Sequence, residues 1–232
     1  MQNELSKLLR FAACFAFVGS TAATAKAQVT FGPEVNKPGP ALAAFAKAYD
    51  NVNDYTMTDT VSEQTNDGAK KQNRVYAYKF MKPHLVDSKI VSGPGAGSAA
   101  VWRGGDKVKG HQGGLFSALK MTVPITDGRA TSLRGNTIDK GTLTFVLQTM
   151  LSTPGTLVEN PGPEIAGGQT TAVELDDATP QRNGETKVVL YLSNASHLPV
   201  KRQVYAGSVP VLTALFTDLK TNIGLKQDDF DM

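Results

Sequence analysis

The fold is decided by residues 76–114, which read YAYKFMKPHLVDSKIVSGPGAGSAAVWRGGDKVKGHQGG. Short β-prone runs alternate here with three interruptions: Lys82-Pro83, residues 93–97 and residues 104–106. Proline lacks an amide donor and glycine tolerates a positive φ, so each interruption ends strand pairing and turns the chain. We expect consecutive antiparallel strands. Neither phosphate-loop nor nucleophile-elbow spacing occurs in the stretch, which indicates a scaffold around a surface or cavity.

Strand signals continue on both sides of this stretch. The Asn-Asp-Gly sequence at residues 66–68 predicts a hairpin between residues 55–64 and residues 74–80. The aromatic side chains of the second run alternate along the chain, so they share one face. Nine or ten strands are expected in all. The further runs are residues 85–91, 98–103, 107–111, 119–125, 170–175, 187–192, 200–205 and 211–219.

Two segments have the apolar periodicity of helices. One begins at Pro40, and the other begins near Asp139, which is a possible N-cap. Each stripe must cover something apolar, and the concave face of the sheet is the natural partner. The sequence therefore predicts an α+β fold: a strongly curved antiparallel sheet, or incomplete β-barrel, covered by two helices. The stripes are Leu42, Phe45, Ala46, Tyr49 and Val52, then Leu143, Val146, Leu147, Met150 and Leu151.

Residues 1–27 have the organisation of a cleavable secretory signal. Lys7 and Arg10 precede an apolar run, and a small-residue cleavage site, Ala-Lys-Ala, ends at residue 27. The apolar run is far shorter than the roughly 20 residues that an uncleaved anchor needs. We expect the mature chain, residues 28–232, to be a single domain that acts outside the cytoplasm.

The single cysteine, Cys14, lies inside this leader. A lipid-anchoring motif ending at Cys14 is the alternative, but three residues after Arg10 leave no room for an apolar signal segment. The mature chain then has neither a disulfide nor a thiol. The leader holds three of the 24 basic residues and one of the 21 acidic ones, which leaves 21 and 20. This near-neutral balance, without a Lys/Arg cluster, argues against nucleic acid as a partner, and no later segment is apolar enough to span a bilayer.

The order of these elements resembles LolA, the periplasmic outer-membrane lipoprotein carrier, and the wider lipoprotein-sorting superfamily. The resemblance rests on the leading helix, the Asn-Asp-Gly turn, Lys82-Pro83, the turn at residues 102–107 and the late strand at residues 197–202. An uncharacterised branch of the superfamily also shares a T-x-x-R-G-x-T-I element like residues 131–138.

The resemblance implies a periplasmic half-barrel, lidded by helices, that shelters lipid or lipoprotein acyl chains without catalysis or a cofactor. An envelope protein is a possible further partner. Lys82 and Pro83 carry over as a turn and Trp102 as a wall or rim aromatic. One position departs from the family: where LolA has an arginine that hydrogen-bonds the lid, this chain has Asp87. Asp87 is expected to face solvent or to pair with Lys89 or Arg74 across strands.

The same periodicities supply candidate ligand-binding residues on the apolar face. Plain core is the commoner role of such rows, and a protein-interaction module without a cavity is the main alternative to a carrier. A contiguous cavity beneath the two helices would favour the carrier. The candidates are Tyr76, Tyr78, Phe80, Ile90, Trp102, Leu143, Val146, Leu147 and Met150.

An enzyme is the second alternative. The three histidines lack metal-site spacing and the serines lack a G-x-S-x-G frame, so no metal is expected and a hydrolase site would have to form by tertiary contact alone. Residues 152–168 are expected to form a surface connection or a lid. The acidic residues near the C-terminus are expected to be a solvated tail, with cation binding as the alternative. The residues concerned are His84, His111, His197, Ser98, Ser117, Ser132, Asp228, Asp229 and Asp231.

Overall fold

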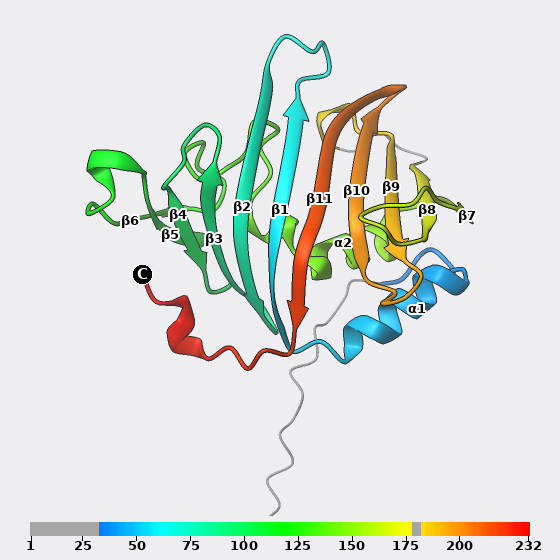
Figure 1. Cartoon of the computed structure of the whole chain (residues 1–232). Helices are drawn as coiled ribbons and strands as arrows, with labels where there is room; N and C mark the ends of the chain where they lie inside the picture. Colours follow the sequence, from blue (N-terminus) through cyan, green and yellow to red (C-terminus); the bar gives the residue numbers. More distant parts are fainter. Residues whose placement is uncertain (1–32, 178–181) are drawn as a thin grey trace, which may run out of the picture.

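The computed structural model describes residues 33–177 and 182–232 (Figure 1). The expected leader at residues 1–27, with Cys14, lies outside the described residues. Within the described ranges, no helix has the length and apolar character needed to cross a membrane.

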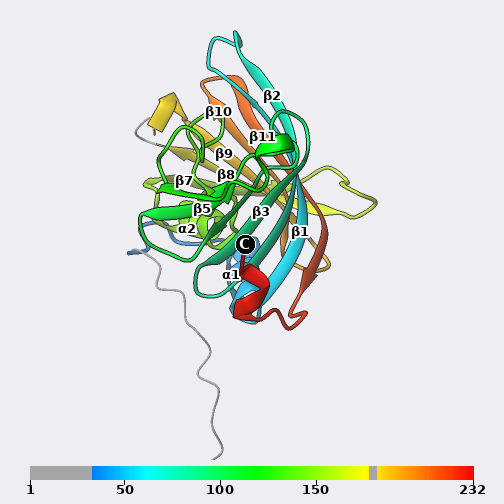
Figure 2. The same cartoon turned by 90° about the vertical axis from the view of Figure 1, so that its left-hand side faces the viewer.

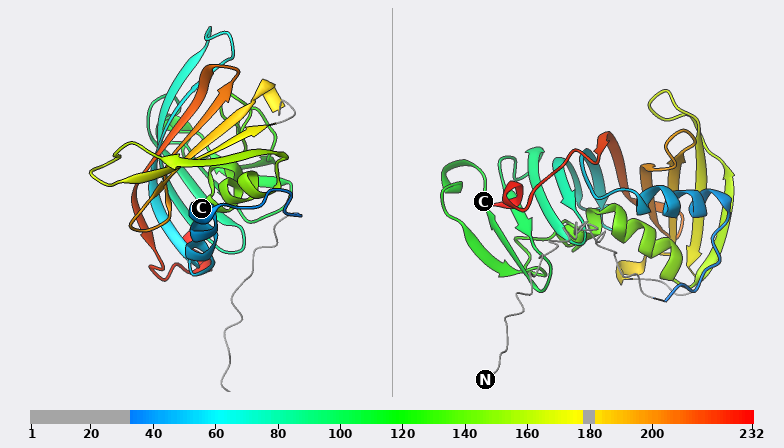
Figure 3. Two further views of the ribbon diagram at one scale, coloured as in Figure 1. Left: turned by 90° about the vertical axis from the view of Figure 1, so that its right-hand side faces the viewer. Right: turned by 90° about the horizontal axis from the view of Figure 1, so that it is seen from below.

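One antiparallel sheet of eleven strands forms the body of the protein. The strand order is β6-β5-β4-β3-β2-β1-β11-β10-β9-β8-β7, so the last strand of the chain pairs with the first. The sheet curls strongly without closing, and β6 and β7 remain as its edges (Figure 2, Figure 3). The expected fold class is confirmed. The strands are β1 Asp54–Gln64, β2 Lys71–Met81, β3 Leu85–Ser92, β4 Ala99–Trp102, β5 Lys107–His111, β6 Met121–Pro124, β7 Gly155–Pro161, β8 Thr170–Asp177, β9 Lys187–Ser193, β10 Pro199–Ala206 and β11 Val209–Thr221.

The turn between β1 and β2 forms at the Asn-Asp-Gly sequence. The hairpin at residues 66–68 joins β1 and β2, and Gly68 has a φ of 69°. Pairing then runs without a break from Asp54 opposite Met81 to Gln64 opposite Lys71. The Asn-Asp-Gly signal therefore sets the register of the longest hairpin in this half of the sheet.

The strand β7 corrects the expectation of a loop over residues 152–168. Residues 155–161 pair with β8 and form one edge of the sheet. An edge strand has only one neighbour and tolerates both the glycine at its start and the proline at its end. The burial of β7 alternates, but of its partly buried positions Gly155, Leu157 and Glu159 only Leu157 is apolar, so the sequence lacks the apolar alternation that would have revealed the strand.

Both expected helices are present, α1 Pro40–Asp50 and α2 Leu143–Ser152. The expected N-cap of α2 is wrong: Asp139 lies in the short 3₁₀ helix η2 Ile138–Gly141, and the helix starts after Thr142. The Thr142 hydroxyl accepts a hydrogen bond from the Phe145 amide at 3.1 Å, as an N-cap does.

Glu159 of β7 supplies the cap that α1 lacks in its own sequence. Gly39, the residue before α1, has no side chain to offer. Instead the two carboxylate oxygens of Glu159 accept the amides of Ala41 and Leu42, each at 2.9 Å. A Cβ atom on Gly39 would lie 2.5 Å from the Glu159 carboxylate carbon, so only glycine leaves room for this contact.

The main core lies between the two helices and the concave face of the sheet. Seen from below, α1 and α2 lie inside the curve of the sheet, toward the β8–β11 half (Figure 3). Their stripes are buried with strand residues such as Leu175 and Leu190, and each large side chain contributes about 1.5–3 kcal/mol by burial. Large side chains fill the space directly beneath the two helices.

The C-terminal segment folds back over the convex face of the sheet (Figure 1). Its 3₁₀ helix η4 Gln227–Phe230 carries Phe230, which is fully buried against Leu85 and Val101. Arg103 donates to the Phe230 carbonyl oxygen at 3.2 Å and forms an ion pair with Asp231. The expectation of a wholly solvated tail is therefore wrong, since one aromatic side chain anchors it.

Candidate functional site

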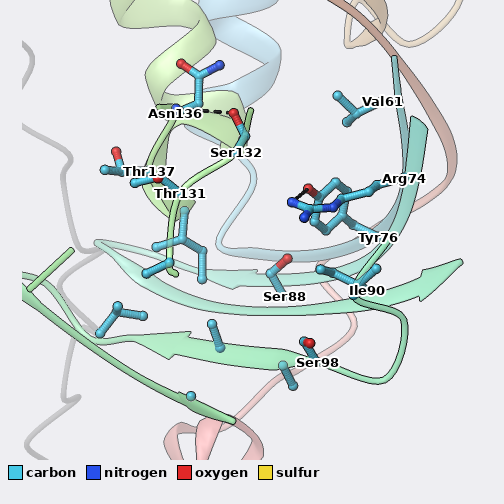
Figure 4. Close-up of a pocket in the computed structure, with 18 of the residues that line it drawn as sticks. Val61, Arg74, Tyr76, Ser88, Ile90, Ser98, Thr131, Ser132, Asn136 and Thr137 are labelled. Carbon is cyan, nitrogen blue, oxygen red and sulfur yellow. Dashed lines mark hydrogen bonds between the residues drawn. The ribbon is translucent and has the colours of Figure 1, made fainter. Parts of the chain in front are cut away.

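A pocket of about 710 Å³ lies on the concave face, in the half of the sheet that the helices leave open. The inward faces of β1–β5 and β11 form one wall, and the segment between β6 and α2 forms the other. We call this segment, residues 125–141, the strap. Figure 4 shows Thr131, Ser132 and Asn136 of the strap across the pocket from Tyr76 and Ile90 of the sheet.

Small side chains on three adjacent strands create the space. Ser88 of β3 pairs with Ala100 of β4, which pairs with Gly110 of β5. All three residues line the pocket. Because a closely packed interior leaves few voids, a row of small residues on a concave sheet leaves room that the facing strap does not fill.

Glu63 holds the middle of the strap to the end of β1. Its carboxylate accepts hydrogen bonds from the Ser132 hydroxyl at 2.7 Å, the Leu133 amide at 3.1 Å and the Asn136 side-chain amide at 3.2 Å. Glu63 is 4% exposed, so these bonds replace the water that a buried carboxylate loses. Gly135, with a φ of 72°, lets the strap turn between these contacts.

Arg134 fixes the strap to the β1–β2 turn and to the segment before β9. Its guanidinium donates to the Gln64 carbonyl oxygen at 2.8 Å, to the Asn66 side chain at 3.1 Å and to Glu185. The carbonyl oxygen of Arg134 in turn accepts the Asn183 side-chain amide at 2.7 Å. The T-x-x-R-G-x-T-I element of the sequence thus corresponds to the clamped part of the strap.

Two charged side chains, Asp59 and Arg202, interrupt the apolar floor of the pocket. They come from β1 and β10 and are 4% and 9% exposed. Burial raises the pKa of Asp59 to about 7, with Arg202 opposing and Glu63 adding to that rise. Neither Asp59 Oδ1 nor Arg202 Nε has a hydrogen-bond partner among the described residues.

The sequence analysis did not predict this pair, although the alternation along β1 indicates that Asp59 faces inward. Asp59 stands in the same alternation as Tyr55, Met57 and Val61, which places its side chain on the inward face. A charged residue at such a position is the signal that could have found it. The strap has no apolar periodicity, and in the sequence only the T-x-x-R-G-x-T-I element at residues 131–138 marked it.

The candidate residues separate into two groups. Tyr76, Tyr78 and Ile90 line the pocket. The remaining ones belong to the core or its margin and do not line it: Phe80, Leu143, Val146, Leu147 and Met150 are buried in the main cluster, and Trp102 packs against that cluster. Tyr78 belongs to both groups: it is a buried member of the main core, 5% exposed, and it also lines the pocket. Its hydroxyl donates to the Ile138 carbonyl oxygen of the strap.

The turn and latch positions lie away from the pocket. Lys82, which precedes Pro83 through a cis peptide bond, donates from Nζ to the Tyr49 carbonyl oxygen at 2.8 Å, at the C-terminal end of α1. A cation there complements the helix dipole. Asp87 pairs with Lys79 at 3.0 Å, where β3 and β2 stand in register, so the expected partners Lys89 and Arg74 are wrong.

The pocket contains groups that a hydrolase would use, but they do not converge. The Nδ1 atom of His111 forms a hydrogen bond with the Gln112 carbonyl oxygen at 3.0 Å. The Ser132 hydroxyl donates to Glu63, and the Ser98 hydroxyl accepts the Gly113 amide. Within residues 33–177 and 182–232 no serine hydrogen-bonds a histidine, and no group of three His, Cys, Asp or Glu side chains is placed to hold a metal ion.

No protein-family model and no curated protein matches the chain. Similar solved structures include the lipoprotein LppX of Mycobacterium tuberculosis, 13% identical, with a TM-score of 0.48 over 84% of this chain and 100% of that one. A putative outer membrane lipoprotein-sorting protein domain from Vibrio parahaemolyticus is 13% identical, with a TM-score of 0.44 over 82% and 95% of the two chains. A LolA superfamily protein from Nitrosomonas europaea is 11% identical, with a TM-score of 0.41 over 84% and 99%.

Proposed function

We propose that the protein binds and carries a hydrophobic molecule, a lipid or the acyl chains of a lipoprotein, in the pocket between the sheet and the strap. The pocket itself carries this proposal. Its volume of about 710 Å³ is in the range of small-molecule sites, and its wall combines aliphatic and aromatic side chains with a few polar groups.

The free energy gained by moving an acyl chain from water into the pocket is large enough for a carrier. Each methylene moved out of water contributes about 0.8 kcal/mol, so ten methylenes contribute about 8 kcal/mol before the entropy of association is subtracted. A chain held in this way needs no covalent bond. It is released when a partner or a membrane offers an equally apolar environment.

The alternative of a protein-interaction module requires a sheet whose inner face is sealed throughout. The inner face is sealed under α1 and α2 but stays open beside the strap, and this difference favours ligand binding. The leader-like residues 1–27 favour a location in the periplasm, where apolar molecules need shelter from water during transfer.

Pocket filling tests the proposal. The substitution Ala100→Phe places a ring in the row of small residues, and we expect the mature protein to lose binding of a fluorescent fatty-acyl probe by about tenfold or more. The matched control is Ala77→Phe on β2, whose side chain is exposed on the other face of the sheet. Equal binding by wild type and Ala100→Phe would contradict the proposal.

A second measurement identifies what the pocket holds. Mature protein purified under native conditions is extracted with organic solvent, and the extract is compared by mass spectrometry with that of Ala100→Phe. We expect lipid in the first extract and much less in the second. Absence of lipid together with failure of the probe to bind would remove the carrier function.

A further inference from the structure

We propose that Asp59 and Arg202 form a binding site for a hydroxyl group, so that the ligand is a neutral amphiphile with an alcohol end and an apolar chain. The inference rests on the proposed function and specifies the class of ligand. It comes from two buried polar atoms that line the pocket without partners among the described residues, Asp59 Oδ1 and Arg202 Nε. Buried polar atoms are normally paired, so an unpaired acceptor and an unpaired donor in one pocket indicate a ligand group.

The sheet brings these two side chains to the same floor. Arg202 of β10 stands opposite Ala214 of β11, and Ala214 stands opposite Val61 of β1. Asp59 lies two residues before Val61 on the same face, opposite Phe216. Since Ala214 carries only a methyl group, it leaves room for the long Arg202 side chain above the sheet.

Part of the Arg202 guanidinium is already engaged. Nη1 donates to the Lys140 carbonyl oxygen of the strap at 3.3 Å, and the guanidinium carbon lies 5.6 Å from the centre of the Phe145 ring. These contacts fix the plane of the group and leave Nε as the donor without a partner. The site is therefore held in position before a ligand enters.

A hydroxyl is the group that satisfies both atoms at once. Its oxygen accepts a hydrogen bond from Arg202 Nε, and its hydrogen donates to Asp59 Oδ1. An ether or ester oxygen only accepts, so it would leave an ionised Asp59 unpaired. A carboxylate also only accepts, and it brings a negative charge near Glu63, whose own oxygens are occupied by the strap.

The protonation state of Asp59 changes the affinity for a carboxylate but not for a hydroxyl. Its surroundings include Arg202 and Glu63, and the carboxyl also lies close enough to act on the hydroxyls of Tyr76 and Tyr78. When Asp59 is protonated it can donate, so a carboxylate fits; when Asp59 is ionised a carboxylate is repelled. A hydroxyl fits both forms because it both donates and accepts.

Competition binding with three matched probes tests the site. Dodecanol, its methyl ether and dodecanoate displace a fluorescent acyl probe from the mature protein, at concentrations below those at which they self-associate. Above pH 7 we expect dodecanol to bind about tenfold or more tightly than either competitor, the worth of about one buried hydrogen bond to a charged group. Below pH 7 the affinity for dodecanoate should rise while that for dodecanol stays within about threefold.

The variants Asp59→Leu and Asp59→Asn test whether the preference for dodecanol depends on the Asp59 side chain. Asp59→Leu should bind dodecanol and its methyl ether equally, whereas Thr131→Val, which changes a polar strap residue of the same pocket, should keep the wild-type preference. If Asp59→Leu does not fold, Asp59→Asn decides: it should keep the preference for dodecanol but lose the pH dependence of dodecanoate binding.

The outcomes distinguish the two proposals. If the wild type binds none of the probes, the carrier function fails. If it binds all three equally, or binds dodecanoate most tightly above pH 7, the carrier function stands and the hydroxyl site is overturned. A preference for dodecanol that survives in Asp59→Leu also overturns it.

Discussion

Glu159 caps α1 at Leu42: the carboxylate Oε1 accepts the Leu42 amide at 2.9 Å although 117 residues separate the two in sequence. The other carboxylate oxygen accepts the Ala41 amide. The edge strand β7 therefore supports the start of the first helix as well as extending the sheet.

Replacing Glu159 should destabilise the protein through α1. The substitution Glu159→Ala removes two acceptors from the first turn of the helix, and we expect the free energy of unfolding to fall by about 1–2 kcal/mol. Urea denaturation followed by circular dichroism measures the change. Glu164→Ala, at an exposed site in the loop after β7, should change it by less than about 0.5 kcal/mol. Similar losses in both variants would show that the cap contributes nothing.

Two arginines of the strap should differ sharply in their contribution to stability. The Arg134 side chain is 2% exposed and is paired with Glu185, so Arg134→Met should cost about 3 kcal/mol. The Arg129 side chain is 55% exposed beside Asp127, so Arg129→Met should cost less than about 1 kcal/mol. Chemical denaturation of both variants compares them, and limited proteolysis should show cleavage in the strap of Arg134→Met only. A strap equally resistant in both would argue against the clamp.

Asp59 should make the protein less stable as the pH rises. Its pKa is about 7 in the folded protein against an ordinary value of 3.8, so the folded state holds a proton that the unfolded state releases between these values. The resulting stabilisation is fully present below about pH 4 and is lost as the pH rises through 7; its size is on the order of 4 kcal/mol. The difference between wild type and Asp59→Asn isolates this contribution from those of other carboxyl groups.

The measurement is a series of denaturation curves for both proteins across this pH range. Asp59→Asn should lack the decline and should be the more stable protein above pH 7, where the wild type carries a buried charge. Parallel curves for the two proteins would mean that Asp59 titrates normally.

The buried aromatic of the C-terminal segment should carry most of its attachment energy. Phe230→Ala should lower the free energy of unfolding by about 3 kcal/mol or more, because a fully buried ring is removed. Ile223→Ala changes a residue of the same segment that is 48% exposed and should cost less than about 1 kcal/mol. Thermal unfolding of the two variants makes the comparison. If the two melt together, the segment is not anchored by Phe230.

Much of the fold could be predicted because most inward positions of the central strands are apolar. The alternation around Tyr76 and Tyr78 shows which side faces inward, and the Asn-Asp-Gly turn sets the register. The strand β7 was missed because Gly155 and Glu159 occupy two of its three partly buried positions, so apolar side chains do not alternate along it. The N-cap was misplaced because both Asp139 and Thr142 are capping residues, and the 3₁₀ turn between them decides which one starts the helix.

The site was less accessible from sequence than the fold. Periodicity identifies residues that face inward, but it does not distinguish a filled interior from an empty one. Phe80 and Tyr76 lie in the same row of β2, yet Phe80 stacks on Tyr55 in the core and Tyr76 lines the pocket. The difference arises from what lies opposite, packed core in one case and the strap in the other. Only the tertiary structure supplies that information.

The unequal filling of the concave face divides one continuous sheet into two mechanical parts. Close-packed side chains under α1 and α2 resist compression, so that half is stiff. The other half is bounded by a single chain segment, so its shape depends on the contacts that Glu63 and Arg134 make with that segment. The two parts meet at β1 and β11, which pair with each other and contribute inward side chains to both the main core and the pocket. A molecule wider than the pocket could therefore enter only if the Glu63 and Arg134 contacts of the strap opened, while the helix-covered half kept its packing.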